Sequence, residues 1–452
     1  MFKGLSSVCL ARRIQGVASN TGILTGKRFA DFGIRESLVS ALNNKLGATR
    51  ATEIQAKSFK SILEGKDVTL CSETGSGKTL AYLLPLVERI LRLKSMEPSS
   101  GGGIDLLGRS SPPVVVLCPT SDLCNQVLHV TKSLDQTRTV SKQFLGAPRD
   151  LDLGSEDILV GPRIRWGAVD LVVSTPAKFL EDMNRFKQDK LMPSTIIFDE
   201  ADFMLHGSTN EAIVEILRYI RPPPNSKTRQ SLFCQSVFVS ATMPDIGKKT
   251  IGAMLVQKFM NSEVIETVKF HSIPKSIDSI EFVPELDGDW NQRCYMLTQE
   301  LAKCTDDQKR VLVFVNTQRN ASILYQFLKD KKWPVELFVA GRSRQELNVE
   351  DPGIVIATDV GARGIDWNGG VDVVINFQMP TDIVAWIHRA GRCGRLGRVG
   401  RVVSFYKKQE EELVDMLKKQ LDFGDKLDGL FSRKRSLRKR LRSNPKIDRP
   451  PS

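Results

Sequence analysis

Residues 68–84 read VTLCSETGSGKTLAYLL: an apolar run, a loop that contains glycine, and the start of an apolar helical pattern. Gly75 and Gly77 let backbone N–H groups turn toward a phosphate, and the amino terminus of the helix adds partial positive charge. Lys78 can then bridge the outer phosphates of a nucleotide, and the Thr79 hydroxyl can hold Mg²⁺. The stretch therefore predicts a nucleotide-binding loop between a strand and a helix. We expect the nucleotide to be held by Ser72, Glu73, Thr74, Gly75, Ser76, Gly77, Lys78 and Thr79.

A second apolar run, residues 195–198, leads directly into three acids, Asp199, Glu200 and Asp202. Mg²⁺ that is bound with nucleotide phosphates needs a carboxylate at the carboxyl end of a neighbouring parallel strand, and we expect Asp199 to supply it. Glu200 is placed to orient or deprotonate the water that attacks the γ-phosphate. The alternative is an acidic strand end in solvent. With the loop upstream, the pattern predicts a nucleotide with a γ-phosphate, together with Mg²⁺, as cofactors.

The composition limits the class of protein. Lys and Arg total 65 against 52 Asp and Glu, a formal charge of +13, which favours a polyanionic partner such as nucleic acid, although solubility explains the charge equally well. The eight cysteines show no CxxC or Cys/His ligand spacing, which argues for reduced thiols and against structural zinc. No apolar stretch approaches the roughly 20 residues that span a bilayer, so we expect no membrane association.

Short apolar runs alternate with helical patterns along the chain, which predicts parallel sheets covered by helices on both faces. The runs form two series, and two α/β domains in tandem fit them better than one large sheet. The first series is 68–70, 114–117, 171–173, 196–198 and 237–239, and the second is 311–315, 335–338, 354–356, 371–375 and 401–405. We expect domains at residues 29–268 and 275–425, with a surface loop at 95–113.

Both ends of the chain are basic. Residues 1–28 contain Lys, Arg and Ser but no acid, which predicts an organellar transit peptide, mitochondrial rather than chloroplast, with a disordered basic arm as the alternative. The tail at 426–452 holds nine Lys and Arg from Ser432 onward, with Asp448 as the only acid of that run. Such a tail can anchor RNA through counterion release, or it can be a solvated or nuclear-address segment.

Residues 199–202 spell DEAD, and together with the loop at 71–79 they make the chain resemble the DEAD-box RNA helicases of superfamily 2, over roughly residues 29–410. SAT at 240–242, TDVGARGID at 358–366 and HRAGRCGR at 388–395 are similar to further motifs of that family in order and spacing. The resemblance implies two tandem RecA-like domains, each a parallel sheet covered by helices on both faces.

The resemblance also implies roles for single residues. Phe29 and Gln55 match the residues that recognise adenine, and Asp366 matches the one that contacts the ribose. Arg392 and Arg395 of the second domain would act as arginine fingers on the phosphate charge, because a planar guanidinium can hold two phosphate oxygens at once. The residues that couple the nucleotide to RNA would be Asp202, Ser240, Thr242, His388 and Arg389. The RNA contacts would be Pro119, Thr120, Thr175, Pro176, Lys178, Thr317, Thr358, Gly361 and Arg363.

Several motifs depart from the family pattern. PTSDL at 119–123 replaces PTREL, so Ser121 stands where an arginine is usual, and TPAK at 175–178 replaces TPGR. Ser72 stands where the GxxxxGK[ST] pattern has glycine. The segment that begins at Ala340 lacks the usual His and Asp of an HGD-like start. Apart from Ser72, these changes fall on segments expected to bind RNA, so the ATP site stays nearly intact.

The sequence therefore predicts an ATP-dependent RNA helicase, a monomer, that binds RNA without sequence specificity and opens short duplexes or remodels ribonucleoprotein locally. The resemblance of the tail to organellar members suggests organellar ribosomal RNA as substrate and assembly factors as protein partners. Two alternatives are a non-hydrolysing RNA scaffold and an ATP-timed clamp or annealing chaperone. Retention of Lys78, Glu200, Arg392 and Arg395 argues against the scaffold, whereas the sequence does not separate the clamp from the helicase.

Overall fold

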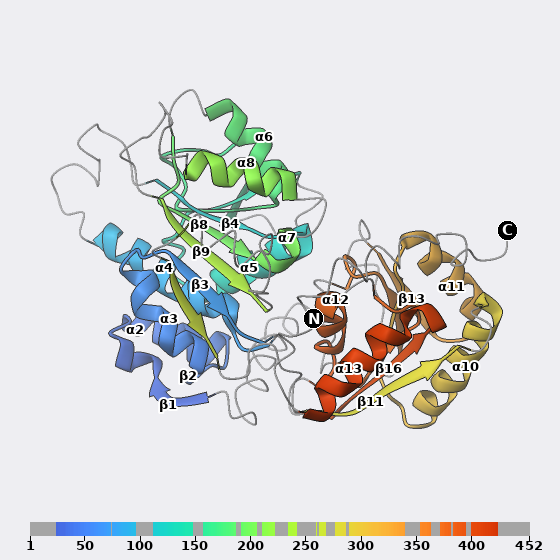
Figure 1. Ribbon diagram of the computed structural model, residues 1–452. Helices are drawn as coiled ribbons and strands as arrows, with labels where there is room; N and C mark the ends of the chain where they lie inside the picture. The colour runs from blue at the N-terminus through green and yellow to red at the C-terminus, as the bar shows by residue number, and fades with distance from the viewer. Residues whose placement is uncertain are drawn as a thin grey trace, which may run out of the picture. The chain divides into compact units, whose positions relative to one another are not determined.

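The computed structural model describes two compact units, residues 24–267 and residues 276–423 (Figure 1). The described residues are 24–73, 75–95, 112–147, 157–186, 191–205, 210–221, 234–241, 259, 262–267, 276–285, 289–339, 353–362, 371–380, 383–394 and 399–423. The expected surface loop, the basic tail and most of the expected transit peptide lie outside these ranges.

The first unit is built on an eight-stranded parallel sheet with the strand order β10-β3-β9-β8-β4-β7-β5-β6. Its strands are β3 (Val68–Cys71), β4 (Val114–Leu117), β5 (Lys142–Leu145), β6 (Ile158–Gly161), β7 (Leu171–Ser174), β8 (Thr195–Asp199), β9 (Gln235–Ser240) and β10 (Glu263–Glu266). A separate antiparallel pair, β1 (Leu24–Arg28) and β2 (Arg50–Thr52), precedes the sheet.

Helices cover both faces of this sheet, as Figure 1 shows for α3 and α4 on one side and α6 and α8 on the other. Successive strand residues point to opposite faces, so Val116 packs under the first set of helices and Val115 under the second. The elements are η1 (Phe29–Phe32), α2 (Glu36–Lys45), α3 (Glu53–Leu63), α4 (Lys78–Ser95), α5 (Ser121–Leu134), α6 (Pro176–Phe186), α7 (Ala201–Met204) and α8 (Asn210–Ile220).

The second unit contains a six-stranded parallel sheet with the order β11-β16-β15-β12-β14-β13, again between two apolar cores. Its strands are β11 (Ile277–Pro284), β12 (Val311–Phe314), β13 (Val335–Phe338), β14 (Ile354–Ala357), β15 (Val373–Asn376) and β16 (Gly400–Tyr406). Its helices are α10 (Trp290–Asp306), α11 (Gln318–Asp330), α12 (Ile383–Ala390), η5 (Lys408–Glu410) and α13 (Glu411–Phe423).

The expected fold class is confirmed, because both sheets are parallel and every predicted apolar run is a strand. Strands β5, β6, β10 and β11 were not predicted. Strands β5, β10 and β11 contain polar residues, β6 is a run of only four residues that ends in glycine, and β6, β10 and β11 lie at sheet edges, where one side needs no apolar cover. Within the described ranges, no helix is both long and apolar enough to cross a bilayer.

The edge of the first sheet depends on a buried ion pair. Lys142 Nζ lies 2.6 Å from Asp135 Oδ2, and the two side chains are 1% and 0% exposed. The Asp135 carboxylate also accepts the N–H groups of Thr139 and Val140, at 2.9 and 3.0 Å. The pair therefore fixes the turn between α5 and β5.

We expect Asp135→Ala to lower the stability of the first unit by about 3 to 5 kcal/mol, because it leaves a buried ammonium without a counter-charge. Urea unfolding followed by circular dichroism measures the loss. Glu64→Ala is the control, since it breaks only the exposed pairs of Glu64 with Lys60 and Lys66, at 3.7 and 3.0 Å, and we expect it to lower stability far less. Equal effects of the two substitutions would contradict the prediction.

Candidate active site at the carboxyl ends of the strands

The predicted motifs of the first unit gather at one edge of its sheet. Because the strands are parallel, their carboxyl ends meet there. The loop at 72–77 follows β3, the acids follow β8, Ser240 ends β9, and Pro119 and Thr175 follow β4 and β7. Sequence spacing alone gave the order of these segments, and the sheet places them side by side.

The phosphate loop takes the conformation that its glycines allow. Gly75 and Gly77 have φ angles of 82° and 87°, in the left-handed region that favours glycine. Lys78 Nζ donates to the carbonyl oxygens of Ser72 and Glu73, both at 2.7 Å. Burial lowers the Lys78 pKa, and the carboxylates of Asp199, Asp202, Glu73 and Glu200 oppose that shift.

Two hydroxyl groups complete this loop. The Ser76 hydroxyl is buried and has no hydrogen-bond partner among the described residues, which is costly unless a ligand satisfies it. Thr267 follows β10, and its hydroxyl lies 3.2 Å from the Ser72 hydroxyl and 3.1 Å from Glu73 Oε2. Thr74, which the sequence placed in the same loop, lies outside the described residues. The sequence did not predict the contact of Thr267 with Ser72 and Glu73, because these residues lie far apart in the chain.

Gln55 links the phosphate loop to the start of α3. Its Nε2 donates to the Gly77 carbonyl at 3.1 Å, and its Oε1 accepts the Thr52 N–H at 2.9 Å. A Cβ at position 77 would displace this amide, and the φ of 87° also favours glycine there. Phe29, in η1, is buried. Adenine recognition by Gln55 and Phe29 stays a prediction.

Asp199 ends β8, and both of its carboxylate oxygens have donors. Tyr82 Oη donates to Oδ2 at 2.8 Å, and the Glu200 N–H donates to Oδ1 at 3.0 Å. Burial and the neighbouring Glu200 charge raise the Asp199 pKa to about 6, against the opposing effects of Tyr82 and Lys78. Tyr82 was missed from the sequence because it reads as a core residue of α4. Its position four residues after Lys78, on the same helix face, was the available signal.

Glu200 has φ and ψ of 54° and 49°, the left-handed region that a residue with a Cβ rarely adopts. It occupies the sharp junction between β8 and α7. Such backbone strain costs on the order of 1–3 kcal/mol and is held by the surrounding packing. Asp202 and Ser240 are fully buried, and the Ser240 carbonyl accepts the Ser72 N–H at 3.2 Å. Thr242 lies outside the described residues.

The predicted RNA contacts of the first unit begin helices. The Thr120 hydroxyl accepts the Leu123 N–H at 3.3 Å and so caps α5, directly after Pro119. Thr175 precedes α6, which begins at Pro176. These positions leave the backbone at the carboxyl edge, as a phosphate-binding surface requires.

In the second unit the corresponding residues also follow strand ends. The Thr317 hydroxyl accepts the Asn320 N–H at 3.1 Å and caps α11, and the Thr358 hydroxyl accepts the Gly361 N–H at 3.2 Å. A Cβ at Gly361 would collide with the Phe338 carbonyl oxygen. Arg363 and Asp366 lie outside the described residues.

Arg389 is 1% exposed and uses all five guanidinium N–H donors within the second unit. Its partners are the Asp359 carboxylate at 2.6 and 2.8 Å, Asn316 Oδ1 at 2.8 Å, the Gln378 carbonyl at 2.8 Å and Asn376 Oδ1 at 3.2 Å. Asn316, Asn376, Gln378 and Asp359 were not among the predicted site residues.

The remaining residues of this motif lie close by in the chain. His388 is 8% exposed, and half-buried Arg392 lies in the turn after α12, where its N–H donates to the Arg389 carbonyl at 3.0 Å. Arg395 lies outside the described residues. The finger role of Arg392 stays a prediction.

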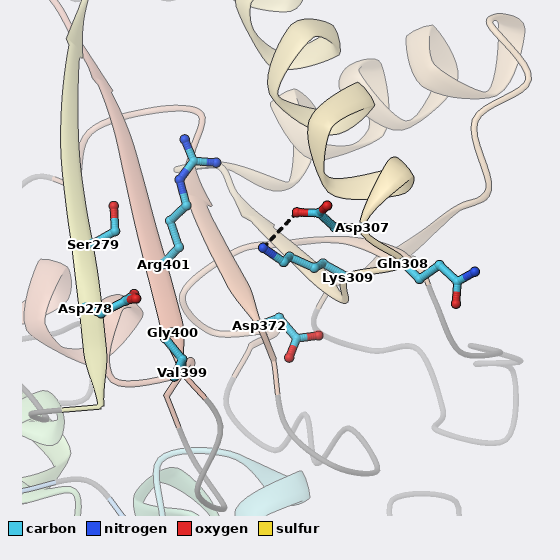
Figure 2. A pocket seen from close by; sticks show the side chains of 9 residues that line it. All are labelled: Asp278, Ser279, Asp307, Gln308, Lys309, Asp372, Val399, Gly400 and Arg401. Atoms are coloured by element: carbon cyan, nitrogen blue, oxygen red, sulfur yellow. Dashed lines mark ion pairs between the residues drawn. The ribbon is translucent and has the colours of Figure 1, made fainter.

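A cavity of about 400 Å³ in the second unit lies at the opposite edge of its sheet (Figure 2). Its lining includes Asp278, Asp372 and Gly400, which lie at the amino ends of β11, β15 and β16. Figure 2 shows the ion pair of Lys309 with Asp307, at 3.0 Å, on its wall. Because the motif residues follow the carboxyl ends of the strands, this cavity is separate from the candidate site.

Two family models match the chain: "DEAD/DEAH box helicase" over residues 52–249 and "Helicase conserved C-terminal domain" over residues 292–397. The chain belongs to the DEAD-box helicase family. The sequence similarity extends well beyond the motifs. DEAD-box ATP-dependent RNA helicase 22 of Oryza sativa subsp. japonica is 26% identical over 91% of this chain and 83% of that protein. RhpA of Helicobacter pylori (strain B128) is 26% identical over 87% of this chain and 72% of that protein. This DEAD-box protein is an RNA helicase and ATPase.

Solved structures agree on the fold of this DEAD-box helicase. Dbp5 of S. cerevisiae bound to RNA and ADP BeF3 aligns with a TM-score of 0.66 and 22% identity, over 92% of this chain and 100% of that one. Mss116 bound to ssRNA and UDP-BeF aligns with a TM-score of 0.67 and 22% identity, over 88% of this chain and 77% of that one. At this identity the likeness supports the tandem RecA-like fold.

We expect Tyr82→Phe to lower kcat/KM for ATP in this helicase about ten- to hundredfold, because one hydrogen bond to a charged group contributes about 1.5–3 kcal/mol. The ring that fills the core is retained, so the melting temperature should change little. Steady-state hydrolysis and a thermal melt measure both quantities. Tyr219→Phe is the control. It removes a partly buried hydroxyl that donates to the Leu191 carbonyl, away from the site, and should leave kcat/KM unchanged. Unaltered hydrolysis by Tyr82→Phe would refute the positioning of Asp199 by this hydroxyl.

Asp199→Asn should stabilise the folded helicase at neutral pH while it abolishes hydrolysis. The folded-state pKa of Asp199 is raised from 3.8 to about 6, so above pH 6 its ionised form costs folding free energy, by up to about 3 kcal/mol. Between these two pKa values the folded wild type takes up the proton, and the cost fades. The difference in melting temperature between variant and wild type, measured without nucleotide, should therefore be largest above pH 6 and shrink toward pH 4. A difference that grows as pH falls would contradict this sign.

Proposed function

We propose that this DEAD-box helicase uses ATP hydrolysis to open short RNA duplexes or to remodel ribonucleoprotein locally, without sequence specificity. The observation that carries the proposal is the cluster of Lys78, Asp199 and Glu200 at one sheet edge, beside segments that expose backbone for RNA. Hydrolytic groups and RNA contacts share this edge, so binding at one can alter the other.

The residues at this edge fit Mg²⁺ and a nucleotide. In the described part of the chain, no group of three or more His, Cys, Asp or Glu side chains forms a metal cage, which suits an ion held mainly by phosphates and water with one or two protein oxygens. Thr79, at the first turn of α4, and Asp199 would supply those oxygens. When bound, Mg²⁺ would neutralise charge on the outer phosphates. The unpartnered Ser76 hydroxyl and the turned N–H groups of the loop are donors suited to phosphate oxygens.

Glu200 would act on the attacking water, because its backbone conformation turns it at the end of β8, next to Asp199. Lys78 would leave its two carbonyl partners for phosphate oxygens when the nucleotide binds. Arg392 and Arg395 of the second unit would stabilise the charge that develops on the γ-phosphate. We expect substitution of any of these groups to lower the rate of hydrolysis more than the stability of the fold.

RNA would be held through phosphates and 2′-hydroxyl groups, which gives affinity with little sequence information. A bound strand that is bent at this surface cannot keep its complement, so short duplexes would part locally, and hydrolysis would release the RNA. The proposal does not require tracking along the strand.

We place this activity in the mitochondrion, on organellar ribosomal RNA during subunit assembly, with assembly factors as partners. The composition of residues 1–28 and the basic tail at 426–452 support this placement. Imaging of the full-length tagged protein against organelle markers, followed by crosslinking to RNA in cells, tests it. A protein confined to the nucleus or cytosol would overturn it.

A steady-state ATPase assay with and without single-stranded RNA tests the proposed activity. We expect RNA to stimulate hydrolysis, and Glu200→Gln to reduce the rate about 10²- to 10⁴-fold, because a positioned general base contributes on that order. Glu211→Gln, at an exposed position on α8, is the matched control and should retain the rate. Absence of hydrolysis by the wild type would favour the RNA scaffold. Hydrolysis without release of a short duplex would favour the clamp.

A further inference from the structure

The predicted RNA contacts of the first unit carry little positive charge. Pro119, Thr120 and Thr175 are neutral, and Ser121 stands where the family pattern has arginine. Lys178 is the basic residue among them, and its Nζ lies 3.1 Å from the Glu181 carboxylate, both side chains being exposed. Affinity for RNA comes largely from Lys and Arg that displace counterions from phosphates. A surface with this composition needs additional cations nearby.

The crossover from β6 to β7, residues 162–170, carries two arginines and is bonded to α6, the helix that contains Lys178. Strand β6 ends at the same carboxyl edge as β7 and β5, and the chain then returns to the start of β7. Arg163 and Arg165 are exposed on this crossover, while Ile164 between them is 7% exposed and packs in the core that lies under α6. With Ile164 directed inward, the flanking guanidinium groups are held outward.

The backbone of the crossover is fixed by two buried side chains. Gln143 Nε2 donates to the Arg163 carbonyl at 2.6 Å, and the Arg165 N–H donates to Gln143 Oε1 at 3.0 Å. The Ile164 N–H donates to Asp182 Oδ2 at 3.0 Å. Gln143 and Asp182 are 1% and 4% exposed. Fixed backbone lowers the entropy that the arginines lose when they bind a ligand.

Asp182 belongs to α6, the helix that begins at Pro176 of the predicted RNA motif. The crossover is therefore attached to the same helix that orients Thr175 and Lys178 at the edge. In the described part of the chain, neither Arg163 nor Arg165 forms an ion pair, in contrast to Lys178. Both side chains are exposed, and the Arg163 charge also acts through space on the Asp182 carboxyl, whose pKa it lowers against the effect of burial.

We propose that Arg163 and Arg165 form a phosphate-binding surface that extends the RNA path from the Thr175 segment onto the β6–β7 crossover, in place of the charge missing at Ser121. This inference rests on the proposed RNA-dependent function and adds a site to it. The ligand is the sugar–phosphate backbone, since two guanidinium groups on a convex crossover offer no pocket for a base. The contact adds affinity without sequence preference.

The test is binding of a fluorescein-labelled single-stranded oligouridine to the full chain with a non-hydrolysable ATP analogue, followed by anisotropy over a range of KCl concentrations. The Arg163→Gln/Arg165→Gln variant should bind about tenfold more weakly. Its slope of log affinity against log salt should be smaller by about 1.4, since each lost phosphate contact on a single strand removes about 0.7. Arg163→Lys/Arg165→Lys should restore most of the affinity, because a lysine still supplies a point charge.

Lys45→Gln/Lys60→Gln is the matched control: it removes the same charge from exposed positions on α2 and α3 and should leave affinity and slope within twofold of wild type. Thermal melts check that all variants fold. Wild-type affinity and slope in the Arg163→Gln/Arg165→Gln variant, beside RNA-stimulated hydrolysis by the wild type, would overturn this inference alone. A wild type that neither binds the oligouridine nor is stimulated by RNA would overturn the proposed function and this site together.

Discussion

The candidate site depends on one charge cluster at the carboxyl edge of the first sheet, in which the charge of half-buried Lys78 interacts through space with several carboxylates. Burial lowers the Lys78 pKa, and the charges of Asp199, Asp202 and Glu73 oppose that change. Isolated charges at this depth would be very costly, so each is tolerated because the others are present. The parallel strands bring these groups together, because Glu73 and Lys78 follow β3, whereas Asp199 and Asp202 lie at the end of β8 or just after it. We expect a bound nucleotide to add its phosphate charges to the same balance.

The second unit applies the same principle with a single guanidinium. Arg389 is buried and bonded to Asn316 after β12, Asp359 after β14 and the Gln378 carbonyl after β15. One side chain therefore fixes three strand ends relative to one another. A lysine could not replace it, because three donors on a flexible stem do not match five directed contacts. Its bond to Asn316 also holds the residue before Thr317, which caps α11.

The sequence predicted what depends on local pattern. Central strands such as β4 are buried on both faces and read as continuous apolar runs, and the phosphate loop and the acids after β8 are contiguous motifs. The sequence did not predict β5, because Lys142 within it is buried only through its pairing with Asp135, seven residues away, which no periodicity reveals. Nor did it predict Tyr82 or Thr267, since their hydroxyl contacts join positions far apart in the chain. Sequence patterns therefore did not predict polar contacts between side chains of different elements.

One departure from the family pattern, Ser72, makes a hydrogen bond that a glycine could not make. Ser72, where the loop pattern has glycine, introduces a hydroxyl that is fully buried, and the Thr267 hydroxyl 3.2 Å away satisfies it. The substitution therefore ties the phosphate loop to the last strand of the first unit, a contact that glycine could not make. A loop held in this way loses less entropy on binding a nucleotide, because part of its order exists beforehand. Divergence in this chain thus alters how the loop is supported while the groups that face the phosphates, Lys78 and Thr79, keep their types.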